Sequence, residues 1–236
     1  MNKLFFSWPQ KDRALPIICV CVGQVIWGFS YLFTRIAQRS ASPTVVLSMR
    51  FLASWVIMTA LIWSGKKSFS LKGKNFRPLL VLALLEPPYY FFESYGVYYS
   101  NATFAGTVMA FAPVVGILAA MLFLGEKPSR RQKIFALLPT AGVIIMTAVG
   151  SSMGIVKPLG AIFLFASQIV AAGMKLYNKK SSEEFSSFER TYAIVVANAI
   201  IFTIKSMIDL HGDVRAYAAP LGNPEYVFAL VILCLF

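Results

Sequence analysis

Long apolar segments alternate with short polar ones along the whole chain. We expect seven of them to cross a membrane as helices, at about 15–37, 43–63, 79–99, 103–124, 134–149, 159–176 and 191–208. A crossing needs roughly 20 apolar residues, and the last apolar segment, 227–236, is about half of one. The pattern therefore predicts an all-α, polytopic helical membrane protein with seven full transmembrane helices and part of an eighth. We expect this chain to be incomplete at its C-terminal end.

The composition agrees with a membrane protein and argues against nucleic-acid binding. Of the 236 residues 58% are hydrophobic and only 14% are charged, whereas a soluble domain carries about 25% charged residues. The net charge of +12 does not come from one basic patch, because the lysines and arginines lie in short runs between apolar segments. No metal-ligand spacing and no disulfide framework is visible among the three cysteines.

The distribution of positive charge predicts the orientation. Basic residues gather in the N-terminal segment 1–14, in 66–77, in 127–133 and in 175–190. All four regions fall on one side of the membrane if the N-terminus is cytoplasmic, and the loops on the other side hold few basic residues. Because cytoplasmic loops are enriched in Lys and Arg, we expect an integral protein of the cytoplasmic (plasma) membrane with a cytoplasmic N-terminus.

The segment 79–99 combines a membrane-length apolar run with two acids. Glu86 and Glu93 are seven residues apart and share one helical face with Tyr90. A carboxylate within a membrane helix is costly to bury, so it is a candidate functional group by default. Pro87 and Pro88 lack backbone donors, and we expect them to interrupt regular helical hydrogen bonding. The segment predicts a polar, broken face lining a cavity, with snorkelling of the acids as the alternative.

Other polar positions within the apolar segments are further candidates. Arg50 could hold a substrate carboxylate, pair with Glu93, or serve only as a structural or snorkelling charge. Trp27 and Ser30 are candidates for lining a central cavity, with packing as the alternative for the Trp. Gln168 is the corresponding candidate in the later segment 159–176.

Three short patterns coincide along the first part of the chain. They are Trp27-Gly28 followed by Arg35, the run Arg50-Phe51-Leu52-Ala53, and FAPVVGILAAMLFLGEKPSRRQKIFALLPTAGVIIM at 111–146. In order and spacing they resemble an EamA-type repeat of the drug/metabolite transporter (DMT) superfamily. The resemblance implies two five-helix repeats of opposite membrane orientation. The first would occupy 15–149, and the second, incomplete, 158–236.

The resemblance implies a secondary transporter, with alternating access at a cavity between the repeats. Its substrates would be small metabolites or amino-acid-like solutes, and it would export or exchange them. A non-transporting membrane scaffold or an intramembrane enzyme is the alternative. No phosphate-binding loop, nucleophile motif or metal constellation is visible, so we expect no enzyme activity, cofactor or metal. The expected partners are the lipid bilayer and a small-molecule substrate, with protons and a second copy of the chain as open alternatives.

Overall fold

The structure is a computed structural model that describes residues 14–112 and 157–235, with scattered positions between 114 and 141. This part is helical and contains no strand. Its elements are α1 (Ala14–Ala37), α2 (Pro43–Trp63), α3 (Arg77–Tyr99), α4 (Ala102–Met109), α7 (Pro158–Ser181), α8 (Ser187–Asp209), α9 (Val214–Ala218), the 3₁₀ turn η2 (Ala219–Gly222) and α10 (Pro224–Leu235). The expected helix at 103–124 is described without a gap only to residue 112, where α4 ends at Met109, and most of the expected helix at 134–149 lies outside the described residues.

The observed helices begin close to the predicted positions, but the later ones are longer. α7 continues to Ser181, and Lys179 and Lys180 in its last turn favour a helix C-terminus because they complement its negative end. α8 begins at Ser187 because Ser186 and Glu189 form a reciprocal capping box. The polar segment between α8 and α10 is not a simple loop but contains α9 and η2.

Three described helices are long and apolar enough to cross a membrane, namely α2, α7 and α8, and α9, η2 and α10 together form a fourth candidate bent by 94°. α3 has the necessary length, 23 residues, but is not among them. The prediction that residues 79–99 are apolar enough to mark a membrane crossing was therefore wrong. Two carboxylates, two prolines and several tyrosines lower its hydropathy. Its crossing remains a prediction.

α3 also differs from expectation in being one continuous helix through Pro87 and Pro88. The predicted break was wrong because proline fixes φ near the helical value and disturbs mainly the preceding turn. The two missing N–H groups are those that would bond to the carbonyls of Ala83 and Leu84, four residues earlier. α3 nevertheless continues as one helix past both prolines.

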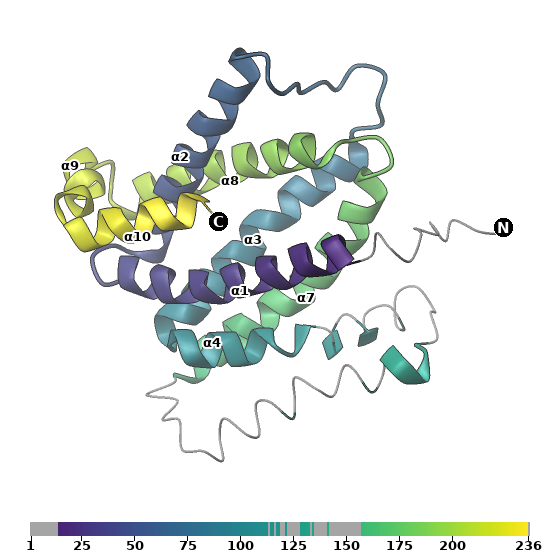
Figure 1. The fold of residues 1–236 in the computed structure, drawn as a ribbon. Helices are drawn as coiled ribbons and strands as arrows, with labels where there is room; N and C mark the ends of the chain where they lie inside the picture. The colour runs from purple at the N-terminus through teal and green to yellow at the C-terminus, as the bar shows by residue number, and fades with distance from the viewer. Residues whose placement is uncertain are drawn as a thin grey trace.

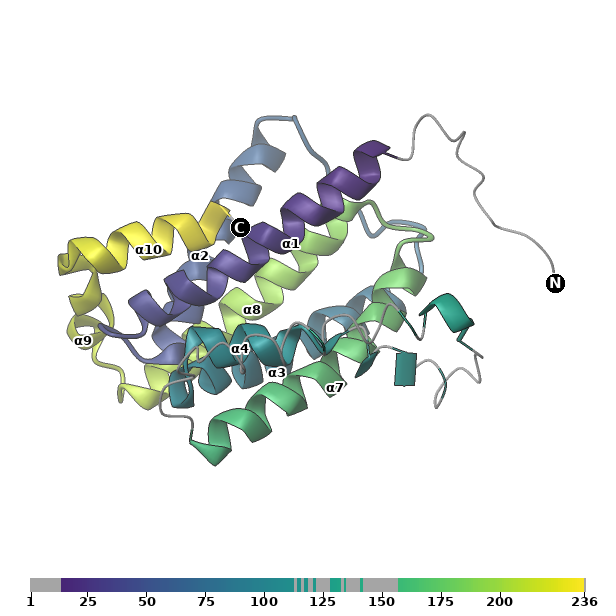
Figure 2. The ribbon, with the colours of Figure 1, turned by 60° about the horizontal axis from the view of Figure 1, so that its bottom comes forward.

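The helices pack in pairs that are far apart in the sequence (Figure 1). α3 lies along α7, α2 along α8 and α1 along α10. α4 contacts both α1 and α7, and Figure 2 shows it between them. Three apolar clusters occupy the contacts, one among α1, α2 and α10, one among α1, α3, α4 and α7, and one between α2 and α8. The two halves of the chain are thus interleaved.

Two glycines allow α3 and α7 to approach closely. A methyl group added at Gly96 of α3 would lie 2.6 Å from Leu164 Cγ of α7. A methyl group at Gly160 of α7 would lie 2.9 Å from the carbonyl carbon of Tyr99. Small residues permit such close packing of membrane helices.

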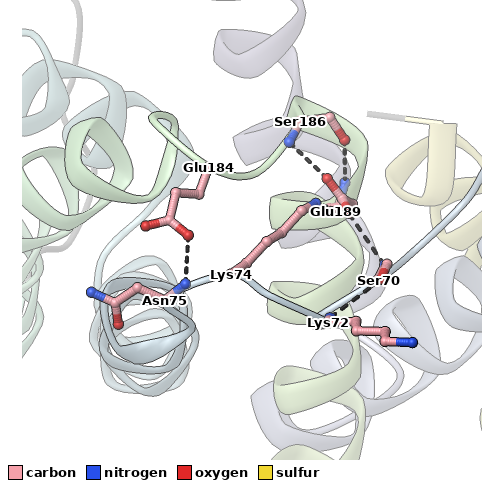
Figure 3. A network of polar contacts seen from close by, with 7 residues as sticks. All are labelled: Ser70, Lys72, Lys74, Asn75, Glu184, Ser186 and Glu189. Carbon is pink, nitrogen blue, oxygen red and sulfur yellow. Dashed lines mark hydrogen bonds and ion pairs between the residues drawn. The ribbon is translucent and has the colours of Figure 1, made fainter.

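The loop 64–76 is bound to the turn between α7 and α8 by a network of polar contacts (Figure 3). Lys74 Nζ lies 2.6 Å from Glu189 Oε1, which also accepts a hydrogen bond from the backbone N–H of Ser70 at 3.2 Å. The backbone N–H of Asn75 donates to Glu184 Oε2 at 2.5 Å. We call this network the loop clasp. It joins two loops that the charge pattern places on the same side of the membrane.

Candidate functional site

Of the seven residues predicted to form the site, two line one cavity, two line another, and Ser30, Glu86 and Glu93 are buried outside both. The larger cavity, about 650 Å³, lies among α1, α4 and α7. Trp27 and Gln168 both line it, together with Tyr31 and Lys175. The structure therefore brings together candidates from the first and the second half of the chain.

Polar and aromatic groups define the larger cavity. Gln168 is buried, and its side-chain amide donates to Met109 Sδ at 2.6 Å. The rings of Trp27 and Tyr31 lie 6.4 Å apart between centroids, one turn apart on α1. Apolar walls with a few polar groups are typical of a small-molecule site. Ser30 is buried nearby, but its hydroxyl donates to the backbone oxygen of Trp27 at 2.6 Å. It thus has a partner within its own helix.

The smaller cavity, about 240 Å³, lies among α2, α3, α8 and α10 and contains Arg50 and Tyr90. The guanidinium carbon of Arg50 lies 5.7 Å from the ring centroids of both Phe51 and Tyr90. Aromatic faces at this distance stabilise a cation. Among the described residues no carboxylate lies within ion-pair distance of Arg50, whose pairing with Glu93 is therefore not formed.

Glu93 is instead held by two tyrosines. Its Oε1 accepts a hydrogen bond from Tyr89 at 2.5 Å and from Tyr31 at 2.9 Å. All three side chains are buried. Since a buried carboxylate is costly without hydrogen bonds, these two phenols explain how α3 can carry Glu93 in its interior. Tyr31 also lines the larger cavity, so the acid lies one hydrogen bond behind the cavity wall.

Glu86 is buried on the same helix, with 8% of its surface exposed. It forms no hydrogen bond or ion pair with another described residue, nor does it line either of the two cavities. Glu86, Tyr90 and Glu93 share one helical face but have different surroundings. Tyr90 lines the smaller cavity, Glu93 is bound by two tyrosines, and Glu86 has neither kind of neighbour. A helical period predicts a shared face but does not predict the neighbours of each side chain.

The tyrosines that bind Glu93 were missed as site residues. Tyr31 follows Trp27 by one helical turn, and Tyr89 precedes Glu93 by one turn. These four-residue spacings, which place two side chains next to each other on a helix, are the sequence pattern that could have identified both tyrosines. Gln38 was also missed, and its amide donates to the backbone oxygen and the hydroxyl of Ser94 at 2.9 and 3.0 Å. These contacts anchor α3 to α1 beside the acid.

Comparison with known proteins relates this geometry to a family. The EamA-like transporter family matches residues 14–148. An uncharacterised transporter of Bacillus subtilis, YcxC, is 30% identical over 88% of this chain and 68% of its own length. An uncharacterised transporter of Archaeoglobus fulgidus is 21% identical over 84% of this chain and 71% of its own length. One of Vibrio cholerae is 27% identical over 65% of this chain and 52% of its own. The family match over more than half of the chain and the Bacillus subtilis relative show that the chain belongs to the EamA-like transporter family, within the DMT superfamily.

Proposed function

We propose that this integral membrane protein is a secondary transporter of small metabolites or amino-acid-like solutes in the cytoplasmic membrane. The observation that carries the proposal is the larger cavity, whose walls come from both halves of the chain. Trp27 and Tyr31 approach from α1, and Gln168 and Lys175 from α7. A site between two halves that move relative to each other can open alternately to the two sides.

We place the first repeat at 15–149 and the second at 158–236, in opposite membrane orientations. Several contacts between loops support this arrangement. The loop clasp joins two loops expected on the cytoplasmic side. On the opposite side Asn223 donates to the Ser40 hydroxyl at 2.9 Å, and the N–H of Lys157 donates to the Tyr99 carbonyl at 3.1 Å. Each pair joins loops that an N-terminus in the cytoplasm would place together.

The loop clasp also supports alternating access. It connects the α2–α3 loop of the first repeat to the α7–α8 turn of the second. Opening the cavity toward that side would require the two repeats to separate there, and the Lys74–Glu189 ion pair would then break. The clasp therefore corresponds to a state closed on the side where these loops lie.

Uptake by proteoliposomes tests the proposal directly. The full-length protein, with a complete second repeat, is purified and reconstituted, and counterflow of radiolabelled amino acids and small organic acids is compared with that of protein-free liposomes. We expect at least one solute to exchange, and Gln168→Leu to reduce its exchange with little change in expression. Ile169→Leu, at an exposed neighbouring position on α7, is the matched control. No exchange by a folded, monodisperse preparation would contradict the proposal.

Coupling to protons is a separate question about Glu86. Glu86→Gln keeps the shape of the side chain and removes its titratable group, so we expect it to flatten the pH dependence of exchange. Glu93→Gln should affect that dependence less, because two tyrosines already bind this acid. An unchanged pH profile in Glu86→Gln would show that Glu86 has no part in proton coupling. A scaffold or an intramembrane enzyme, the remaining alternatives, would exchange no solute. Cross-linking in membranes would detect a homodimer.

A further inference from the structure

A second hollow region lies away from both cavities, on the side of the molecule that carries the loop clasp. Where loop 64–76 meets the first turns of α8, a polar basin of about 390 Å³ is lined by Lys66, Lys67, Ser68 and Ser187. Beyond it an apolar groove of about 350 Å³ runs between α3 and α8. The two hollows differ sharply in chemistry but share one helix.

The basin and the groove follow one face of α8. Phe188 lines the basin, and Tyr192, Val196 and Ile200 follow at four-residue intervals along the groove. Residues four apart lie above one another on a helix. The groove extends about 12 Å from Tyr192 to Ile200, at roughly 1.5 Å per residue. Because α8 is long and apolar enough to cross the membrane, the groove runs from the polar end of the span toward its middle.

The groove is open because its floor is made of small residues. Ala193 and Ala197 of α8 and Ala83 of α3 line it, together with the larger Leu80 and Ile200. Leu80 and Ile200 are about half exposed, at 49% and 48%. No described side chain fills the space between them, so an apolar chain can lie there.

The basin presents positive charge that no described acid neutralises. The two ion pairs among the described residues are Lys74–Glu189 and Lys205–Asp209. Lys66 and Lys67 belong to neither, and Lys67 Nζ lies 5.9 Å above the Phe188 ring. Two of the nearby acids are bound elsewhere, Glu189 by Lys74 and Glu184 by the Asn75 backbone, as Figure 3 shows. Lys72 points away from the clasp in the same view.

We propose that this combined surface binds one anionic phospholipid, with its phosphate over Lys66 and Lys67 and an acyl chain in the groove between α3 and α8. Charge selects the lipid, because the basin offers two ammonium groups without carboxylate partners. The apolar groove, which follows the basin along α8, matches the acyl chain of the same lipid. Leu71 and Phe76 of the loop are about half exposed and would rest at the headgroup level. This inference depends on membrane insertion and is independent of transport.

The first experiment tests whether charge selects the lipid. Lipids are added to the delipidated, detergent-purified protein, and native mass spectrometry measures how much of each lipid binds. Phosphatidylglycerol and phosphatidylcholine with identical chains are the probes. Each basic residue near a membrane surface favours an anionic lipid by about fivefold, so two lysines predict a preference of roughly 25-fold. Lys66→Gln/Lys67→Gln should abolish most of it. Lys179→Gln/Lys180→Gln, with the same charge change at the end of α7, should retain it.

The groove is tested by Ala197→Phe, which fills the floor without altering charge and should weaken binding of both lipids. A phosphatidylglycerol with a diazirine on its acyl chain tests the same point on the unaltered protein, and it should label 79–83 or 192–200. Equal binding of the two lipids, equal losses in the two double variants, or labelling confined to other segments would overturn the proposal.

Discussion

A single methyl group added at Gly160 should separate the first turn of α7 from the end of α3. The added Cβ of Gly160→Ala would lie 2.9 Å from the carbonyl carbon of Tyr99, and 3.1 Å from both the Tyr99 oxygen and the Ser100 nitrogen. All three are backbone atoms, so no side-chain rotation can relieve the contact. The helix itself must move, and the hydrogen bond from the Lys157 N–H to the Tyr99 carbonyl must lengthen.

The magnitude follows from two opposing effects. Inserting a methyl group into a tightly packed contact costs about 1–3 kcal/mol. Replacing Gly by Ala in a helix interior returns up to about 1 kcal/mol, but Gly160 lies in the first turn of α7, where this gain is smaller. We therefore expect a net destabilisation of about 2 kcal/mol, which lowers Tm by roughly 4–8 °C in a chain of this size.

Gly173→Ala provides a matched control on the same helix. Its Cβ would meet only Leu85 Cδ1, at 3.6 Å, an ordinary van der Waals distance. The helix-propensity gain then acts alone, so we expect unchanged or slightly raised stability. The same chemical change should thus lower Tm at Gly160 and leave it unchanged or slightly raised at Gly173.

Thermal unfolding of the purified proteins, followed by circular dichroism in one detergent, measures both shifts. If Gly160→Ala melts at or above the unaltered protein, the close approach of α7 to Tyr99 is wrong. If Gly173→Ala loses as much as Gly160→Ala, the loss arises from glycine in general and not from the contact described here.

Three further predictions concern the loop clasp, the buried acid and the topology. Lys74→Met should cost about 1 kcal/mol or less, because its partly exposed ion pair is weak, whereas Glu189→Ala should cost about 2 kcal/mol because it also removes the capping box. Equal losses in thermal unfolding would contradict this order. Tyr31→Phe should destabilise by about 1–2 kcal/mol because Glu93 loses one of its two donors, and unchanged unfolding would show the hydrogen bond to be dispensable. A cysteine at Ser129 should resist impermeant thiol reagents in intact cells, and labelling from outside would contradict the cytoplasmic N-terminus.

Local patterns in the sequence were enough to predict most described helices. The apolar segment 43–63 coincides with α2, and the segment 15–37 with all but the first residue of α1. Helix formation depends mainly on neighbours within one or two turns and on membrane-length apolar runs. The EamA-type patterns in 15–149 were also sufficient to identify the family, which matches 14–148. Helix ends were predicted less well, because a capping box such as that of α8 extends a helix beyond its apolar run.

Only the tertiary structure decided which partners the buried polar groups find. Counting residues along the predicted helices 43–63 and 79–99 gives Arg50 and Glu93 similar depths in the membrane, but packing directs Glu93 to Tyr31 and Tyr89. Arg50 instead lies against the Phe51 and Tyr90 rings. The depth of a residue in the membrane depends only on its position along the helix, so counting residues is enough to predict it. A hydrogen bond also depends on how each helix is rotated about its axis, and that rotation is determined by contacts between helices distant in the sequence.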